Sequence, residues 1–202
     1  MNLLYEKIIR PLLFKLEAER AHQIAAFSMR ILGKTSPLRG LVAYYCQTKS
    51  SPVRLFGLDF PNPVGLAAGM DKNGEFIKSA FALGFGHVEI GTITPQRQLG
   101  NARPRLFRYP SVNGIVNRMG FNNDGAEIVA DRIKRNYPKG KRNAPLGINI
   151  GKAKTTDLDQ AAEDYITCFK IVAEQADYIA INVSSPNTRS LRTLQKPDRL
   201  EP

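Results

Sequence analysis

Cysteine is scarce in this 202-residue sequence, and long apolar runs are missing from it. The two cysteines, Cys46 and Cys168, match no metal-binding or redox spacing, so we expect reduced thiols in a cytosolic compartment and no metal site. No uninterrupted run of about 18 apolar residues is present, which excludes a membrane-spanning helix. Glu6, Lys7 and Arg10 interrupt the apolar start of the chain and argue against a secretory signal.

The sequence carries a formal net charge of +11, which raises the question of nucleic acid or an anionic membrane as a partner. The basic residues are scattered over four segments, 5–39, 97–108, 132–142 and 189–199, and no single helix has a dense basic face. No interleaving of aromatic and basic residues and no recognition motif occurs. A nucleic-acid-binding module is therefore the weakest interpretation, and we expect no nucleic acid partner. With 43% hydrophobic residues, the composition is typical of a globular protein with a buried core.

Two amphipathic helices are predicted at the start of the chain. Apolar residues recur at helical spacing at Leu4, Ile8, Leu12 and Leu16, and again at Ala21, Ile24, Ala25, Ser28, Ile31 and Leu32. Pro11 interrupts the first helix and is expected to kink it, and Gly33 is suited to end the second. The pair could form a hairpin that packs on the main domain, or a membrane-surface anchor with cationic flanks. Glycine, serine and proline over 34–52 predict a linker, with a domain boundary near residue 50.

Beyond this boundary, strands alternate with helices. A short hairpin is predicted at 53–60, at the mouth of the domain that follows it. Strands are predicted at 63–68, 87–92, 146–150 and from 178 onward, with helices at 75–83, 125–136 and 158–175. This alternation predicts right-handed βαβ units and a parallel sheet. The long connection 93–123 contains two segments, 106–109 and 114–117, that are predicted to pair antiparallel, and a loop of this length usually carries function.

Each predicted strand ends in small and polar residues, over 68–74, 91–95, 149–152 and 182–187. In a parallel sheet all four sets lie on one face, where small residues let a flat ring approach and asparagine and threonine can bond its edges. Lys72 adds a cation for an anionic ligand or an electron-rich ring. Taken singly, the first set is also an ordinary turn with a solvated lysine, and the last an ordinary polar turn. No set has the glycine spacing of a Walker or Rossmann loop.

Five motifs in register resemble the dihydroorotate dehydrogenase family, in its quinone-linked, membrane-associated class. They are 67–74 (AAGMDKNG), 89–95 (EIGTITP), 103–108 (RPRLFR), 117–123 (NRMGFNN) and 182–188 (NVSSPNT). The resemblance implies an α/β fold, a (β/α)8 TIM barrel of which about the first four βα units are present. Residues 1–50 would be a small helical extension, and 51–202 the N-terminal half of an FMN-binding barrel. It also implies oxidation of dihydroorotate to orotate in de novo pyrimidine (UMP) biosynthesis, with hydride passing to FMN and electrons to ubiquinone or menaquinone.

The resemblance implies roles for individual residues. Ser185 stands at the position of the catalytic base, where the soluble class has cysteine, and its weakly basic hydroxyl needs a relay and an oxidised flavin. The implied substrate-binding residues are Lys72, Asn117, Arg118, Met119, Gly120, Phe121, Asn182 and Asn187, with Asn122 alongside. The implied FMN contacts are Ala68, Gly69, Thr92, Asn149 and Asn182. His22 and Arg108 match positions near a quinone tunnel between the N-terminal helices and the barrel.

Two features depart from the family pattern. The family loop commonly continues Asn-Thr-Pro-Gly-Leu-Arg, whereas this chain has Arg189 and Ser190 in place of Pro-Gly, which changes loop stiffness and adds a cation. The chain ends at Pro202, whereas a complete barrel needs roughly 250 residues, so open sheet edges are expected.

We expect a peripheral membrane protein on the cytoplasmic side of a bacterial inner membrane. The alternatives are a truncated, inactive remnant, or a related FMN-dependent barrel that acts on another pyrimidine or uses another acceptor.

Overall fold

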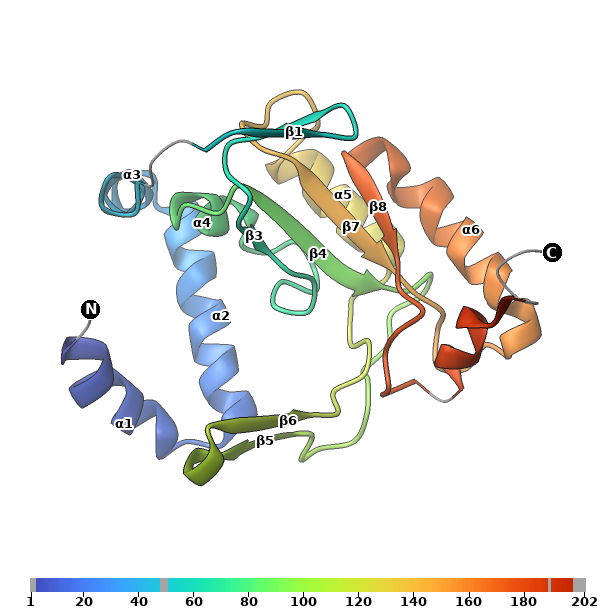
Figure 1. Ribbon diagram of the computed structural model, residues 1–202, viewed down its shortest axis with the longest axis horizontal. Helices are drawn as coiled ribbons and strands as arrows, with labels where there is room; N and C mark the ends of the chain where they lie inside the picture. The colour runs from blue at the N-terminus through green and yellow to red at the C-terminus, as the bar shows by residue number, and fades with distance from the viewer. Residues whose placement is uncertain (1–2, 48–50, 189, 198–202) are drawn as a thin grey trace.

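A computed structural model describes residues 3–47, 51–188 and 190–197 of the chain (Figure 1). Its centre is a four-stranded parallel sheet with the strand order β3-β4-β7-β8. The strands are β3 (Gly65–Leu66), β4 (His87–Ile93), β7 (Leu146–Ile150) and β8 (Tyr178–Ile181). Each strand pairs with the next one of the series along the chain, which is the order of a (β/α) barrel rather than of a doubly wound sheet. The prediction of a parallel α/β fold with part of a barrel is confirmed.

Helices cover one face of this sheet. They are α4 (Ile77–Ala82), α5 (Ala126–Asn136) and α6 (Ala161–Val172), and α6 is flanked by 3-10 turns at Leu158–Gln160 and Ala173–Gln175. The strands present fully buried Val88, Ile90, Leu146 and Ile148 to this interface, and the helices contribute Val129, Ile133, Cys168 and Val172. Burying each large aliphatic side chain contributes roughly 1.5–3 kcal/mol. This core holds the strands in register, and the opposite face of the sheet is left for polar side chains.

The described part of the N-terminal segment is helical almost throughout. It consists of a π-helical turn η1 (Tyr5–Ile9), α1 (Arg10–Phe14), α2 (Ala18–Lys34) and α3 (Ser36–Tyr45). Pro11 is the second residue of α1, in the first turn of a helix where proline is tolerated, and the π-helical turn directly precedes this helix; the kink at Pro11 stays a prediction. The prediction of a linker over 34–52 is wrong for α3, because Ser36 and Pro37 open a helix, in whose first turn proline is tolerated. Residues 48–50 lie outside the described residues.

Two antiparallel hairpins lie at opposite ends of the sheet (Figure 1). Strands β1 (Val53–Leu55) and β2 (Leu58–Phe60) form the first hairpin, as predicted, but its predicted place at the mouth is wrong. The Phe60 ring packs edge-on against the imidazole of His87, the first residue of β4, with 5.3 Å between ring centroids, so this hairpin lies at the amino ends of the strands. The second prediction, pairing of β5 (Leu106–Tyr109) with β6 (Gly114–Asn117), is confirmed; the 3-10 turn η2 (Pro110–Val112) joins them.

A buried ion pair attaches the helical extension to the sheet domain. Glu19 in the first turn of α2 is 3% exposed, and Arg105, in the loop before β5, is 5% exposed. The Arg105 guanidinium donates to Glu19 Oε1 from Nη2 at 2.7 Å and to both carboxylate oxygens from Nε. Arg103 adds a further contact to Glu19 Oε1 at 3.0 Å.

Within the described residues, no helix combines the length and the apolar character that crossing a bilayer requires.

Candidate functional site

The segments that follow the four parallel strands all lie at the carboxyl end of the sheet. Lys72 follows β3, Asn149 belongs to the end of β7, and Ser185 follows β8. The pairings of β3 with β4, β4 with β7 and β7 with β8 are all parallel. These residues therefore lie together at the carboxyl ends of the strands. The predicted convergence of four polar strand ends on one face is confirmed, and it is the usual place of the site in such folds.

Three predicted site residues form one hydrogen-bonded chain across three neighbouring strands. The Thr92 hydroxyl donates to Asn149 Oδ1 at 2.5 Å, and Asn182 Nδ2 donates to Thr92 Oγ1 at 2.8 Å. Asn182 Oδ1 in turn accepts the backbone N–H of Ser184 at 3.0 Å. Each of the three side chains is therefore oriented by its neighbour. A binding site needs polar groups held in fixed directions, and this chain of hydrogen bonds provides them.

Lys72 lies in a loop that is anchored to β4 by backbone hydrogen bonds. The Gly69 N–H donates to Gly91 O at 2.8 Å, and the Gly91 N–H donates to Asp71 O at 3.0 Å. Gly69 has φ of +103°, a conformation that L side chains rarely adopt. The Lys72 ammonium donates to Gly69 O, and burial together with the nearby Arg105 cation lowers the pKa of Lys72. The loop thus holds a partly desolvated cation beside the small residues of the first strand end.

Asp71 fixes the shape of this loop from inside. Asp71 is 1% exposed. Its Oδ1 accepts the backbone N–H of Glu75, and its Oδ2 accepts the backbone N–H of Phe76, both at 2.9 Å. Burial raises the pKa of Asp71, and these backbone donors oppose that rise. The carboxylate therefore takes the place of a backbone acceptor at the start of α4.

Asp71→Asn is expected to lower the free energy of unfolding by about 2 kcal/mol, because an amide NH2 would replace an acceptor oxygen opposite a buried N–H donor. Urea unfolding followed by circular dichroism measures this loss. Asp59→Asn is the matched control, since the Asp59 side chain is 78% exposed and its change should cost under about 0.5 kcal/mol. Equal stabilities of the two variants would contradict the role given to Asp71.

The segment after β6 joins the loop after β8. Asn187 Nδ2 donates to the backbone carbonyl of Asn117 at 3.2 Å, and the Met119 N–H donates to Asn117 Oδ1 at 2.9 Å. Asn101 braces both segments, since its Nδ2 donates to the carbonyls of Arg118 at 2.9 Å and Asn187 at 3.4 Å. Sequence reasoning did not identify Asn101, whose position in a long loop gives no periodic signal.

Neighbouring residues of this segment turn towards the sheet. Met119 and Phe121 are buried, and Gly120 between them has φ of +74°. The Phe121 ring lies close to Gly151, where a Cβ would come within 3.0 Å of it. The Asn122 side-chain oxygen is buried and has no hydrogen-bond partner. The structure therefore brings 117–122 to the same end of the sheet as the hydrogen-bonded chain.

Ser185 is half-buried at the start of the last loop. Its Oγ accepts the backbone N–H of Asn187 at 3.2 Å, which leaves the hydroxyl hydrogen to be donated elsewhere. Ser190 has a left-handed conformation with φ of +56° and precedes the 3-10 turn η5 (Leu191–Gln195). Arg189 lies outside the described residues.

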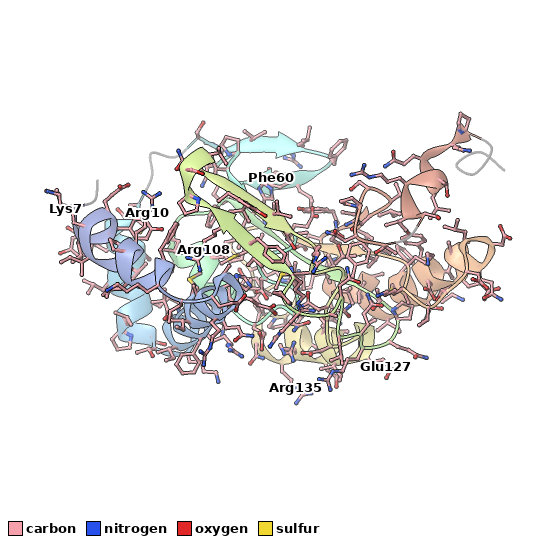
Figure 2. All side chains as sticks on the ribbon, turned by 90° about the horizontal axis from the view of Figure 1, so that it is seen from below. Lys7, Arg10, Phe60, Arg108, Glu127 and Arg135 are labelled. Atoms are coloured by element: carbon pink, nitrogen blue, oxygen red, sulfur yellow. The ribbon has the colours of Figure 1, made fainter. Side chains whose placement is uncertain are left out.

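The two residues predicted near a quinone tunnel lie in separate places. His22 lines a cavity of about 180 Å³ together with Lys72, Met119 and Asn122, and burial and the Lys72 charge lower the pKa of His22. Arg108, labelled in Figure 2, instead donates to the backbone carbonyls of Leu13 at 3.1 Å and Leu16 at 2.8 Å. It lines a different hollow, between β5 and the end of α1. The structure thus brings His22, and not Arg108, to Lys72.

These features define a class of protein: a partial (β/α) barrel with a ligand site at the carboxyl ends of its strands. Both cysteines are free, and the described residues contain no cluster of histidine, cysteine and acidic side chains that could hold a metal ion.

Comparison with known proteins identifies the family. The profile described as dihydroorotate dehydrogenase matches residues 51–202. A dihydroorotate dehydrogenase (quinone) from Stenotrophomonas maltophilia (strain R551-3) is 52% identical over 94% of this chain and 52% of its own length, and one from Cellvibrio japonicus (strain Ueda107) is 50% identical over 95% of this chain and 54% of its own. The crystal structure of DHODH from Eimeria tenella in complex with ferulenol superposes with a TM-score of 0.74 at 40% identity, covering 90% of this chain and 48% of that one. The chain belongs to the dihydroorotate dehydrogenase family, and its resemblance to the quinone-linked class is confirmed. It spans about half the length of the curated relatives it matches.

Proposed function

We propose that this chain forms the N-terminal half of a quinone-dependent dihydroorotate dehydrogenase, which oxidises dihydroorotate to orotate in pyrimidine biosynthesis. The observation that carries the proposal is the hydrogen-bonded chain of Thr92, Asn149 and Asn182, which lies at the same strand ends as Lys72 and Ser185. Relatives about half identical to this chain carry the name of that enzyme.

The residues at the strand ends fit FMN. Ala68 and Gly69 offer little side-chain bulk, and Gly91 has no room for a Cβ, which would lie 2.4 Å from Asn149 O. Small residues let a flat ring approach the backbone, while Thr92 and Asn149 supply polar groups for its edge. When bound, FMN supplies the acceptor for the hydride.

The substrate would bind between the FMN ring and the loops that follow β3, β6 and β8. Lys72 offers a cation to the substrate carboxylate, and Asn117, Asn182 and Asn187 offer amides to its ring edges. Arg118, Met119, Gly120 and Phe121 would shape the remaining wall. Ser185 Oγ would take the proton from the substrate carbon and pass its own hydroxyl hydrogen to a water or hydrogen-bond relay, while hydride leaves the neighbouring carbon.

Residues 1–50 would act as a membrane-facing extension. Leu4, just before η1, Ile8 on η1 and Leu12 on α1 are 53–60% exposed, although all three are strongly apolar. Lys7 and Arg10 point outward at the same end of the molecule (Figure 2). An exposed apolar surface with cationic neighbours favours peripheral contact with an anionic bilayer, here the cytoplasmic side of a bacterial inner membrane. A quinone, ubiquinone or menaquinone, would approach the site past His22, which lines a cavity with Lys72, whereas Arg108 lines a separate hollow beside α1.

The test joins this chain to the C-terminal half of the Stenotrophomonas maltophilia relative and compares the product with the chain alone. We expect the chimera to purify with bound FMN and the flavin absorbance to bleach when dihydroorotate is added without oxygen. Quinone, fumarate and NAD are then offered as acceptors, and quinone should restore the absorbance fastest. The intact relative is the positive control. A flavin-loaded chimera that dihydroorotate cannot reduce would contradict the proposal, and a preference for NAD or fumarate would indicate a related barrel with another acceptor.

A further inference from the structure

The inner face of the sheet carries a carboxylate that has no assigned role. Glu89 lies on β4 between Val88 and Ile90, which point into the helix-covered core, so its own side chain points to the opposite face. Its Oε1 accepts Asn149 Nδ2 at 2.9 Å, and its Oε2 accepts the Tyr178 hydroxyl at 3.1 Å. The partners come from β7 and β8, so one side chain links three strands.

The local sequence makes room for this arrangement. The Tyr178 ring lies across Gly147, where a Cβ would stand 2.1 Å from the ring carbon that carries the hydroxyl. Any larger residue at 147 would push the tyrosine away from Glu89. Burial and the Glu89 charge raise the pKa of Tyr178, so the phenol keeps its hydrogen and serves as a donor. The Glu89 carboxylate therefore accepts one hydrogen bond from the Tyr178 hydroxyl and one from the Asn149 amide.

A carboxylate accepts hydrogen bonds and donates none, so Glu89 decides which way the neighbouring amide points. Asn149 must turn Nδ2 towards Glu89 and Oδ1 towards Thr92. Thr92 then gives its only hydrogen to Asn149 and accepts from Asn182 Nδ2, and the Ser184 N–H holds Asn182 in this direction through its Oδ1. After these bonds are made, the Asn149 and Asn182 amides each keep one N–H hydrogen that none of these contacts uses.

We propose that Glu89 is a positioning residue that fixes the direction of the Asn149 amide, and through it the direction of the Thr92 hydroxyl, so that Asn149 offers an N–H donor to the ligand of the site. The inference rests on the proposed function, in which that ligand is the FMN ring. Ring carbonyl and imine groups are acceptors, and they match donors and not amide oxygens. Glu89 itself need not touch the ring, because it acts through Asn149.

Glu89→Gln separates this role from a merely structural one. A glutamine can still accept from Tyr178 through its oxygen, but it turns an NH2 group towards Asn149. Asn149 then presents Oδ1 to residue 89 and Nδ2 to Thr92, whose oxygen can accept from both amides. Asn182 keeps its direction, because its Oδ1 accepts the backbone N–H of Ser184. The variant is therefore expected to unfold in urea close to the wild-type midpoint, while Asn149 presents an acceptor oxygen where the wild type presents an N–H donor.

The first measurement is FMN affinity by fluorescence titration of the full chain and of the chimera. Glu89→Gln should raise the FMN dissociation constant about 30-fold, because the Asn149 oxygen would face a ring acceptor and leave that buried group without its donor. Tyr178→Phe is the matched control, because it removes the other hydrogen bond to Glu89 and keeps the carboxylate; its effect should stay below about threefold. Unchanged affinity in Glu89→Gln, or equal losses in both variants, would overturn the proposal.

The second measurement needs no FMN and so separates this proposal from the proposed function. In nuclear Overhauser spectra of the chain, the Asn149 NH2 hydrogens should contact the Tyr178 ring in the wild type and the Thr92 methyl group in Glu89→Gln. If the wild type binds no FMN but the Asn149 contacts differ between the two proteins in this way, FMN is refuted as the ligand and the orienting role of Glu89 is supported. An Asn149 amide with the same contacts in both proteins would refute that role.

Discussion

Ser185→Ala in the flavin-loaded chimera is expected to slow the reduction of flavin by dihydroorotate about 100- to 10,000-fold, the usual contribution of a positioned general base. Ser185 Oγ already accepts the Asn187 N–H at 3.2 Å, so its geometry is set before substrate binds. Alanine removes the acceptor for the substrate proton and also the hydrogen bond from the Asn187 N–H, and it adds no bulk to the site. Anaerobic stopped-flow measurement of flavin bleaching gives the rate, and the flavin spectrum of the variant verifies that FMN is still bound.

Two further variants make this result specific. Ser184→Ala changes the adjacent exposed hydroxyl, whose contact to Asn182 Oδ1 at 3.2 Å is duplicated by the Ser184 N–H, and should slow bleaching less than about threefold. Ser185→Cys should keep part of the rate and shift its pH dependence, because a thiol ionises more readily than a hydroxyl. An unchanged bleaching rate in Ser185→Ala would remove Ser185 from the role of base.

The sheet and the site face could be predicted because both depend on local patterns. Apolar residues at alternate positions, such as Leu146, Ile148 and Ile150, mark a strand with one face against the core, and the observed β7 has the predicted bounds 146–150. Because the strands are parallel, the polar residues at their carboxyl ends must lie together at one end of the sheet. The position of a polar residue relative to its strand was therefore enough to bring Thr92, Asn149 and Asn182 together.

Other features depend on contacts that no local pattern encodes. The ion pair of Glu19 and Arg105 joins residues 86 positions apart, and either one alone reads as a solvated charge. Glu89 stands in a strand motif whose other members are apolar or small, and only the pairing of three strands shows what it binds. The predicted linker failed for a different reason, since Ser36 and Pro37 were taken as loop signals when they also begin helices.

Glu19→Gln is expected to lower the free energy of unfolding of the chain by about 3 kcal/mol, the lower end of the range for breaking a buried ion pair from one side. The glutamine has nearly the same shape, but its NH2 group would face the Arg105 guanidinium, which is left buried without its counter-ion. Urea unfolding at neutral pH measures the loss. Glu6→Gln is the control, because Glu6 pairs with Arg10 at 3.6 Å on an exposed helix surface and should cost less than about 0.5 kcal/mol.

The pH dependence decides whether charge is the cause. The hydrogen bond from Arg105 holds the pKa of Glu19 below 4.5, its value in an unfolded chain, so the stability from ionised Glu19 is fully present above pH 4.5. It is lost as the pH falls through the lower pKa of the folded state, where wild-type Glu19 becomes neutral as well. The difference between wild type and Glu19→Gln should therefore narrow steadily as the pH falls below 4.5. A difference that stays constant down to pH 3 would mean that the contact stabilises the helical extension through its shape and packing, and that the charge on Glu19 contributes nothing.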